Sequence, residues 1–175
     1  QELLADLDIP AIHVTHDRDE ALTIGHDLAL IIAGQLRQTG PVAQVTAQPA
    51  DPDTARLLGW SYLGPGTATG GTVQAGLLVL PDTAPPGIQG PVYIYYRPED
   101  VLLATRASDV RAGASLTATV EQIVPTRPLA RIGLASDPPI TALILHRDLE
   151  QLHLQAGTPI CATLPPDCVH TFPAT

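Results

Sequence analysis

The pattern of apolar and polar positions changes near Trp60, and the two sides predict different kinds of structure. Before it, "AIHVT" (11–15) and "DLALIIAG" (27–34) have the length and apolar content of buried parallel strands, whereas "DRDEALTIG" (17–25) predicts a helix. Gly34 is expected to form a turn after the second run, and the next run, "QLRQTG" (35–40), is expected to lie antiparallel to it. Two short helices are predicted to follow, over 41–48 and 52–59. This part of the chain is therefore predicted to be α/β.

After Trp60 the chain consists of short β-like runs separated by glycine and proline, with a turn signal about every ten residues. Most of the 18 prolines fall here, at strand starts and turns where no hydrogen-bond donor is lost. Only "DLEQLHL" (148–154) has the spacing of a helix. The pattern predicts a small antiparallel barrel or sandwich, so the predicted fold class is an α/β segment over 1–60 followed by a β-rich domain over 61–175.

The helix predicted over 17–25 carries signals at both ends. Asp17 is a suitable N-cap, Glu20 three residues later completes a variant of the capping box, and Gly25 is a natural stop. His16 stands directly before this helix, where the run 11–15 ends. The carboxyl ends of strands in α/β sheets and the N-termini of helices are places where anions bind, so His16 is a candidate for donating a hydrogen bond to a phosphate.

Spacing alone leaves a second interpretation of His16 open, that of an ordinary polar histidine at a strand end. His13 falls on the other side of the same run and is predicted to be structural. The remaining histidines have no metal-type spacing, and the two cysteines, Cys161 and Cys168, have no zinc-type spacing. We expect both cysteines to be free thiols in a reducing compartment.

The charge balance limits the function classes. The net charge is −9, with 18 acidic and 9 basic residues, and we expect no nucleic-acid binding because an acidic surface repels phosphate backbones. Every basic residue is an arginine. The stretch "GTATGGTV" (66–73) has the glycine spacing of a phosphate-binding P-loop, but Thr72 stands where that loop needs lysine. We therefore interpret 66–73 as a flexible linker.

A further motif, Arg97-Pro98-Glu99-Asp100, ends an apolar run. Pro98 is predicted to stop the strand, and Arg97 and Glu99 are expected to pair across the turn in a structural role. The apolar runs are far shorter than the ~18 residues of a membrane-spanning helix. Because "QELLADLD" at the start resembles the last part of a helix, we expect the chain to be part of a larger cytosolic protein.

The order of motifs over about fifty residues, from "IPAIHVTHDRDEAL" to "PDTARLLG" (9–59), resembles the end of the nucleotide-binding domain of ATP-binding-cassette (ABC) importers. The shared features are an apolar strand, Thr-His-Asp, an acidic Glu-Ala-Leu helix, a second strand ending in glycine and a later Pro-Ala segment. "YRPEDVLL" (96–103) is similar to the Arg-Pro-Glu turn of the OB-like accessory domain that follows in maltose-, polyamine-, iron- and molybdate-type importers. The resemblance thus implies a nucleotide-binding remnant over 1–60 and an OB-like barrel over 61–175.

By this resemblance His16 is the switch-loop histidine that contacts the γ-phosphate of ATP, and Thr15 and Asp17 shape the loop at the nucleotide. The Walker A loop, the signature motif, the Walker B aspartate and the catalytic glutamate precede this segment in the family. The resemblance therefore implies an ATPase that uses ATP and Mg²⁺ as a complete protein, whereas the 175 residues alone are expected to be inactive and to bind no cofactor. The implied partners are a second ATP-binding subunit and transmembrane permease subunits, at the cytoplasmic face of the membrane.

The transported substrate is less defined by the sequence. The last sixty residues resemble the molybdate-type accessory domain, which implies molybdate or another oxyanion, with iron, polyamine and sugar as alternatives. Pro165 occupies the position of the lysine that contacts the oxyanion in that family, so a regulatory barrel without ligand is preferred. Two other hypotheses stay open: a non-catalytic module that senses a small ligand or oxyanion, and an unrelated β protein in which residues 11–15 and 28–33 would fail to pair with neighbouring strands.

Overall fold

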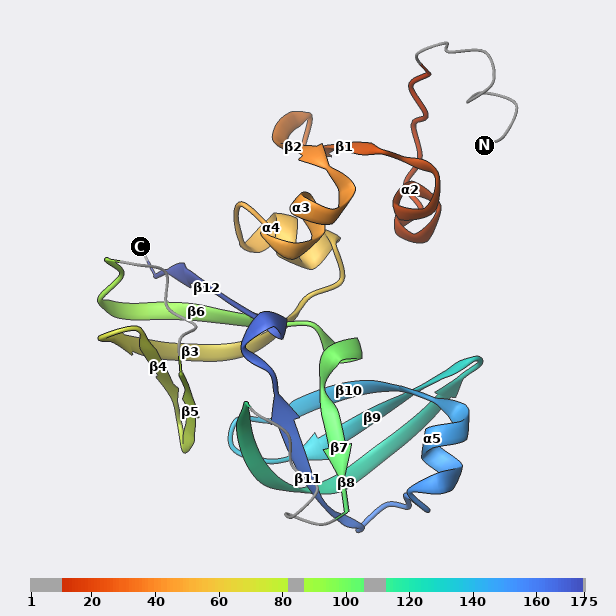
Figure 1. Cartoon of the computed structure of the whole chain (residues 1–175), viewed down its shortest axis with the longest axis vertical. Helices are drawn as coiled ribbons and strands as arrows, with labels where there is room; N and C mark the ends of the chain where they lie inside the picture. Colours follow the sequence, from red (N-terminus) through yellow and green to blue (C-terminus); the bar gives the residue numbers. More distant parts are fainter. Residues whose placement is uncertain (1–10, 82–86, 106–112, 175) are drawn as a thin grey trace. The chain divides into compact units, whose positions relative to one another are not determined.

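The computed structural model describes residues 11–81, 87–105 and 113–174 of the chain. The chain divides into two compact units between Gly59 and Trp60 (Figure 1). The first unit is small and mixed. Its elements are α2 (Arg18–Ile24), β1 (Asp27–Ile32), β2 (Gln35–Pro41), α3 (Val42–Ala47) and α4 (Pro52–Leu57).

The first unit contains an antiparallel hairpin of β1 and β2, as the sequence predicts, with pairing from Asp27 opposite Pro41 to Ile32 opposite Gln35. Its two-residue turn, Ala33-Gly34, has positive φ at both residues (50° and 75°). This is the left-handed backbone that two-residue hairpin turns require. The helices predicted over 17–25 and 52–59 are confirmed as α2 and α4.

The prediction of a buried strand over 11–15 is wrong for this structure. These residues have no regular structure, and the side chains of Ile12 and Val14 are 96% and 89% exposed. A parallel strand is stabilised by a neighbour on each side and by elements that cover both faces. Within residues 11–59 no strand lies beside this stretch. The predicted burial of the strand over 27–34 is wrong as well, because β1 pairs only with β2, buries only Leu28 and leaves Ile31 64% exposed.

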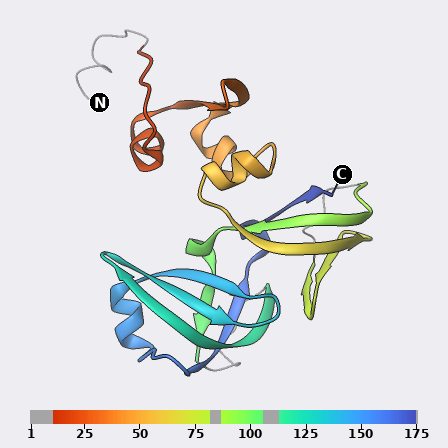
Figure 2. The ribbon, with the colours of Figure 1, turned by 180° about the vertical axis from the view of Figure 1, so that it is seen from behind.

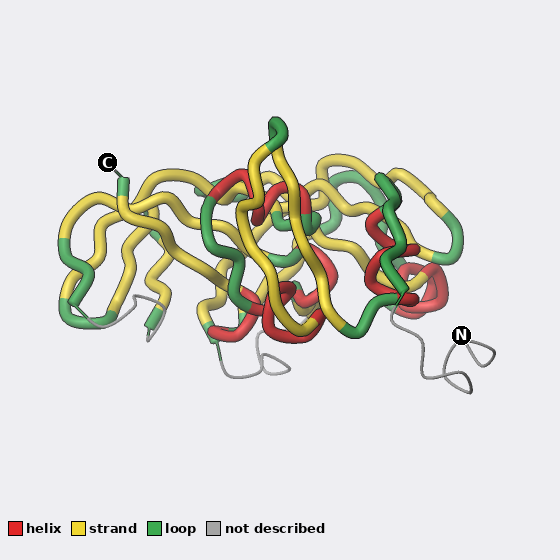
Figure 3. Tube along the Cα trace, turned by 90° about the horizontal axis from the view of Figure 1, so that it is seen from above, coloured by secondary structure: helices red, strands yellow, loops and turns green. Residues whose placement is uncertain are grey.

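The described residues of the second unit form two five-stranded sheets in which every pairing is antiparallel (Figures 2 and 3). The strand orders are β12-β6-β3-β4-β5 and β10-β9-β8-β11-β7. The β-rich architecture predicted after residue 60 is therefore confirmed. The strands are β3 (Ser61–Thr69), β4 (Thr72–Ala75), β5 (Leu78–Leu80), β6 (Gly90–Tyr96), β7 (Leu102–Ala104), β8 (Ala114–Thr126), β9 (Leu129–Ala135), β10 (Ile140–Leu145), β11 (Pro159–Leu164) and β12 (Val169–Pro173), with α5 (His146–Gln151) and two 3-10 turns, η1 (Pro98–Asp100) and η3 (Pro166–Cys168).

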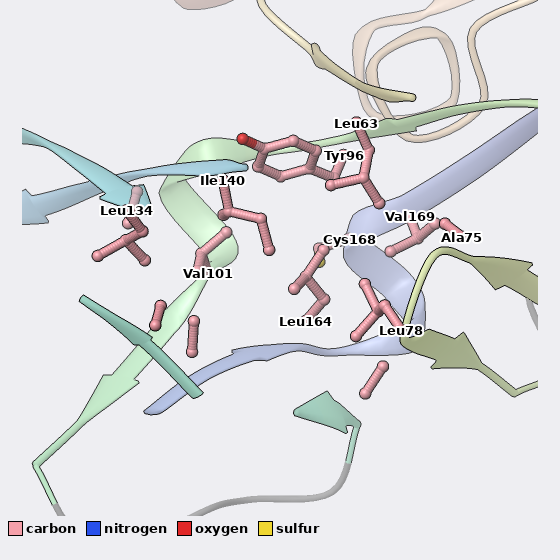
Figure 4. Close-up of a cluster of buried hydrophobic side chains, with 14 of the residues drawn as sticks. Leu63, Ala75, Leu78, Tyr96, Val101, Leu134, Ile140, Leu164, Cys168 and Val169 are labelled. Atoms are coloured by element: carbon pink, nitrogen blue, oxygen red, sulfur yellow. The ribbon is translucent and has the colours of Figure 1, made fainter. Parts of the chain in front are cut away.

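Apolar side chains from both sheets converge on one core of the second unit (Figure 4). Tyr96 in β6 connects the sheets directly, because its hydroxyl accepts a hydrogen bond from the Thr141 N–H of β10 (2.7 Å) and donates one to the Thr141 carbonyl (3.2 Å). Burial raises the pKa of Tyr96 above its ordinary value of 10.0. The two sheets are therefore joined by a polar contact in which the Tyr96 hydroxyl and both backbone groups of Thr141 have hydrogen-bond partners.

The glycine-rich stretch 66–73 is a β-hairpin and not a flexible linker, so that prediction is corrected. The turn of β3 into β4 is Gly70-Gly71, with φ of 60° and 87°. Gly66 has a different role: a Cβ atom there would lie 2.7 Å from the Gln74 carbonyl and 2.6 Å from Ile94 Cδ1. The glycines therefore serve a tight turn and a close approach of strands.

The turn after β6 also differs from its prediction in one contact. Pro98 ends the strand after Tyr96 as expected, but Arg97 pairs with Asp100 (Nε to Oδ2 2.8 Å) and not with Glu99. The Nε atom makes no hydrogen bond with the described residues, so this contact is an ion pair. Arg97 also donates to the Asp167 carbonyl (3.1 Å) and lies 5.3 Å from the centre of the Trp60 ring, which gives it the structural role predicted.

The two cysteines are free, as predicted. Cys161 is partly exposed, whereas Cys168 is buried in the core of the second unit. Burial raises the pKa of Cys168 to about 12. The Cys168 thiol therefore stays protonated at neutral pH and acts as a small apolar side chain.

Candidate functional site

The segment Thr15-His16-Asp17 leads into α2 and is fixed by a ring of local hydrogen bonds. The Asp17 N–H donates to Thr15 Oγ1 (3.0 Å), and the Thr15 hydroxyl donates to the Glu20 carboxylate. The Glu20 N–H in turn donates to Asp17 Oδ1 (3.0 Å), which is the predicted N-cap contact. The backbone on both sides of His16 is therefore held by its neighbours.

Glu20 occupies a different position from the one expected in a capping box. Its side chain contacts the Thr15 hydroxyl and His13 Nε2 (3.3 Å) instead of the Asp17 N–H. The hydrogen bonds from Thr15 and then from His13 hold the pKa of Glu20 below its ordinary value of 4.5. His13, predicted to be structural, thus lies against an exposed carboxylate, and Glu20 links it to Thr15.

His16 is exposed and lies at a bend between these connected neighbours. Across the described ranges, its imidazole makes no hydrogen bond or ion pair with another residue. An exposed side chain of this kind is not buried against the described residues. It is available to an external group that accepts or donates a hydrogen bond.

Arg18 anchors the start of α2 to the end of α4. Its Nη1 donates to the Leu58 carbonyl (2.9 Å), and its Nε lies 3.3 Å from Asp19 Oδ1. Gly59 has a φ of 87°, and a Cβ atom there would lie 1.5 Å from Arg18 Nη1. The positive φ therefore favours glycine at position 59, and a Cβ atom there would also displace the Arg18 guanidinium from the Leu58 carbonyl.

The charges around His16 are mostly negative. Asp17, Asp19 and Glu20 follow it, and Arg18 is the single cation among them. A triphosphate carries several negative charges, so cations beyond this segment would have to balance them. The segment can supply one contact to a phosphate but not a complete phosphate site.

A second candidate site is the position of the oxyanion-contacting lysine. Pro165 precedes η3 and supplies neither a cation nor an N–H group there. Nearby hydroxyls are already engaged, since Ser115 Oγ and Thr163 Oγ1 lie 2.8 Å apart and share a hydrogen bond. Pro165 therefore cannot supply the cationic contact that a lysine at this position would give an oxyanion.

The structure adds a shallow hollow that sequence reasoning missed. Alternate residues of β3, β4 and β5 line it, and they are Thr67, Thr69, Thr72, Gln74 and Val79. The signal was the period-two alternation on both sides of Gly70-Gly71, which the interpretation as a linker ignored. The hollow offers hydroxyl and amide groups but no charge.

Two other structural features are missing from the described residues. No group of three or more His, Cys, Asp or Glu side chains in these ranges could hold a metal ion. No helix found there has the length and apolar content needed to cross a membrane.

Comparison with known proteins gives relatives over most of the chain, although no protein-family model matches it. The chain is 29% identical to the molybdate/tungstate import ATP-binding protein WtpC of Pyrococcus abyssi, over 95% of the chain and 48% of the relative. It is 30% identical to the Fe(3+) ions import ATP-binding protein FbpC of Pseudomonas fluorescens, over 90% of the chain and 49% of the relative. The sulfate/thiosulfate import ATP-binding protein CysA of Xanthomonas campestris is 33% identical over 66% of the chain and 36% of the relative.

Among solved structures, the cytoplasmic molybdate-binding protein ModG, crystallised with molybdate bound, has a TM-score of 0.51. It is 21% identical and covers 62% of this chain and 92% of its own. This likeness supports the OB-like fold predicted for the β-rich domain. The homologues of the chain are ATP-binding subunits of ABC importers, so the resemblance identified in the sequence is confirmed. The chain spans about half the length of the WtpC relatives that it matches.

Proposed function

We propose that the chain acts within the ATP-hydrolysing, energy-coupling subunit of an ABC importer. In this proposal residues 1–60 belong to the nucleotide-binding domain and residues 61–175 form an OB-like regulatory domain. The observation that carries it is the exposed His16, fixed between Thr15 and Asp17, in a chain whose homologues are ATP-binding subunits.

His16 is the residue proposed to act on the nucleotide. Phosphoryl transfer depends on positioning and on stabilising the charge of the transferred group, and an imidazole N–H directed at a γ-phosphate oxygen does both. Thr15 and Asp17 are proposed to hold the loop at the nucleotide, because each is already engaged in the ring of hydrogen bonds around His16. ATP with Mg²⁺ is the proposed cofactor of the complete subunit.

The partners and location follow from the same proposal. A second ATP-binding subunit and transmembrane permease subunits are the proposed partners, and the subunit is proposed to be peripheral at the cytoplasmic face. Molybdate or a related oxyanion is the first candidate for the transported substrate, because WtpC imports molybdate and tungstate by its name. Iron, sugar and polyamine importers are the alternatives, and the FbpC likeness supports iron among them.

The proposal is tested with the complete protein that the gene encodes. We expect it to carry a Walker A loop and a signature motif and to hydrolyse ATP in the presence of Mg²⁺, measured as phosphate release. Residues 1–175 prepared alone are expected to release no phosphate above background. An encoded protein without those two motifs, or a folded complete protein without activity, would refute the proposal.

A second candidate function is an oxyanion sensor, which the fold likeness to molybdate-bound ModG favours. We expect isothermal titration calorimetry of residues 1–175 with molybdate, tungstate and sulfate to give no binding heat, because Pro165 replaces the lysine and Ser115 bonds to Thr163. ModG titrated in the same buffer is the positive control. A saturable heat for any of the three anions would favour the sensor.

A further inference from the structure

The arginines of the described ranges divide into two groups by their contacts. Five of them lie within 4.0 Å of a carboxylate, and these are Arg18, Arg37, Arg56, Arg97 and Arg147. The other two, Arg127 and Arg131, have no carboxylate of the described residues within that distance. In a chain of net charge −9, two arginines without an acidic partner are unexpected.

Both arginines lie on the hairpin of β8 and β9. Arg127 is in the turn between the two strands, and Arg131 is on β9, opposite Val124 of β8 and Leu143 of β10. Both side chains are exposed. The neighbours Ala130 and Ile132 on β9 are fully buried, so Arg131 points away from the core.

Apolar side chains surround Arg131 on the same face of the sheet. Val124 is 36% exposed and Leu145 is 37% exposed, while Leu129 and Leu143 are half-buried. Strand pairing places Leu129 opposite Leu145, next to the pair of Arg131 and Leu143. Figure 2 shows β8, β9 and β10 side by side, with α5 at the end of β10. We refer to Val124, Arg127, Leu129, Arg131, Leu143 and Leu145 as the arginine face.

The chemistry of this face matches a protein surface that carries carboxylates and apolar side chains. Guanidinium groups bind carboxylates through two parallel hydrogen bonds, and arginine is enriched in protein interfaces. An anionic membrane is a poorer match, because each arginine strengthens such binding by only about fivefold and the chain as a whole is repelled. A free small anion would remain hydrated on so open a face, with little gain in binding.

We propose that the arginine face docks an acidic, leucine-bearing helix of a partner protein. The partner's carboxylates pair with Arg127 and Arg131, and its apolar side chains cover Val124, Leu143 and Leu145. This docking is independent of the nucleotide contact proposed for His16. It gives the β-rich unit a partner that is selected by charge.

The test uses a fluorescein-labelled helical peptide with glutamate and leucine on one face, and a matched peptide with glutamine in place of glutamate. Fluorescence anisotropy is expected to show binding of the glutamate peptide to the 175-residue chain about tenfold tighter than binding of the glutamine peptide. The double variant Arg127→Gln/Arg131→Gln is expected to lose about tenfold in affinity. Arg147→Gln, an exposed arginine paired with Asp148, is the matched control and is expected to bind like the unchanged chain.

The proposal has three clear ways to fail. Equal binding of the two peptides, no binding of the glutamate peptide, or equal loss in the Arg147→Gln control would each overturn it. Sedimentation with phosphatidylserine vesicles tests the membrane alternative, and vesicle binding that the double variant abolishes would also overturn the assignment to a protein. Circular dichroism and thermal unfolding of the double variant, expected to match the unchanged chain, separate loss of docking from loss of fold.

Discussion

Replacing His16 by alanine in the complete protein is expected to lower kcat for ATP hydrolysis by roughly 100-fold or more. The Kd for ATP is expected to change by less than about threefold, because one hydrogen bond to the γ-phosphate is a small part of nucleotide binding and matters most in the transition state. The His16 side chain is exposed and makes no hydrogen bond or ion pair with another described residue, so the free energy of unfolding should change by less than about 0.5 kcal/mol. Phosphate release and equilibrium binding of a fluorescent ATP analogue measure the two effects separately.

His13→Ala is the matched control for this variant. His13 lies in the same segment and is exposed as well, but it pairs with Glu20. Its removal is expected to leave kcat within about threefold, since it is not directed at the nucleotide in our proposal. Normal turnover in His16→Ala, or an equal loss in both variants, would refute the assignment of His16 to the γ-phosphate.

Local signals predicted the parts of the first unit that are stabilised locally. Asp17 caps α2 as expected, because an N-cap contact spans three residues and depends on little else. The prediction of a strand over 11–15 was wrong because a parallel strand is not stabilised locally. It depends on neighbouring strands that are distant in the sequence. Ile12 and Val14 are exposed because no such neighbours occur in the described part of the unit.

The sequence predicted the fold class of the β-rich unit but not its turns and side-chain contacts. Short β-like runs with a turn signal about every ten residues indicated the strands, whereas "GTATGGTV" was misinterpreted because glycines occur in both linkers and tight turns. The partner of Arg97 was misassigned because a long side chain reaches more than one carboxylate across a turn. The arginine face could not be predicted, because the pairing of an arginine depends on the folded positions of all acidic residues.

The contact between Tyr96 and Thr141 is expected to be the most sensitive point of the second unit. Tyr96 is 2% exposed and its hydroxyl satisfies both backbone groups of Thr141 at the sheet edge formed by β10. Tyr96→Phe should lower the free energy of unfolding by about 1–3 kcal/mol, because it leaves the part-buried N–H and carbonyl of Thr141 without this partner. Tyr96→Ala should cost about 3–5 kcal/mol, since it also leaves a cavity. Urea unfolding followed by circular dichroism measures both.

Tyr93 provides the matched control on the same strand. It points to the other face of β6 and is 39% exposed, so Tyr93→Phe should change stability by less than about 0.5 kcal/mol. The pH dependence adds a second readout. Because burial raises the pKa of Tyr96 above 10.0, its stabilising contribution is complete below pH 10 and is lost as the pH rises through the folded-state pKa. The difference in stability between the unchanged chain and Tyr96→Phe should therefore shrink above pH 10, and a difference that stays constant there would contradict the raised pKa of Tyr96. A Tyr96→Phe variant as stable as Tyr93→Phe would show that the Tyr96 hydroxyl does not connect the two sheets energetically.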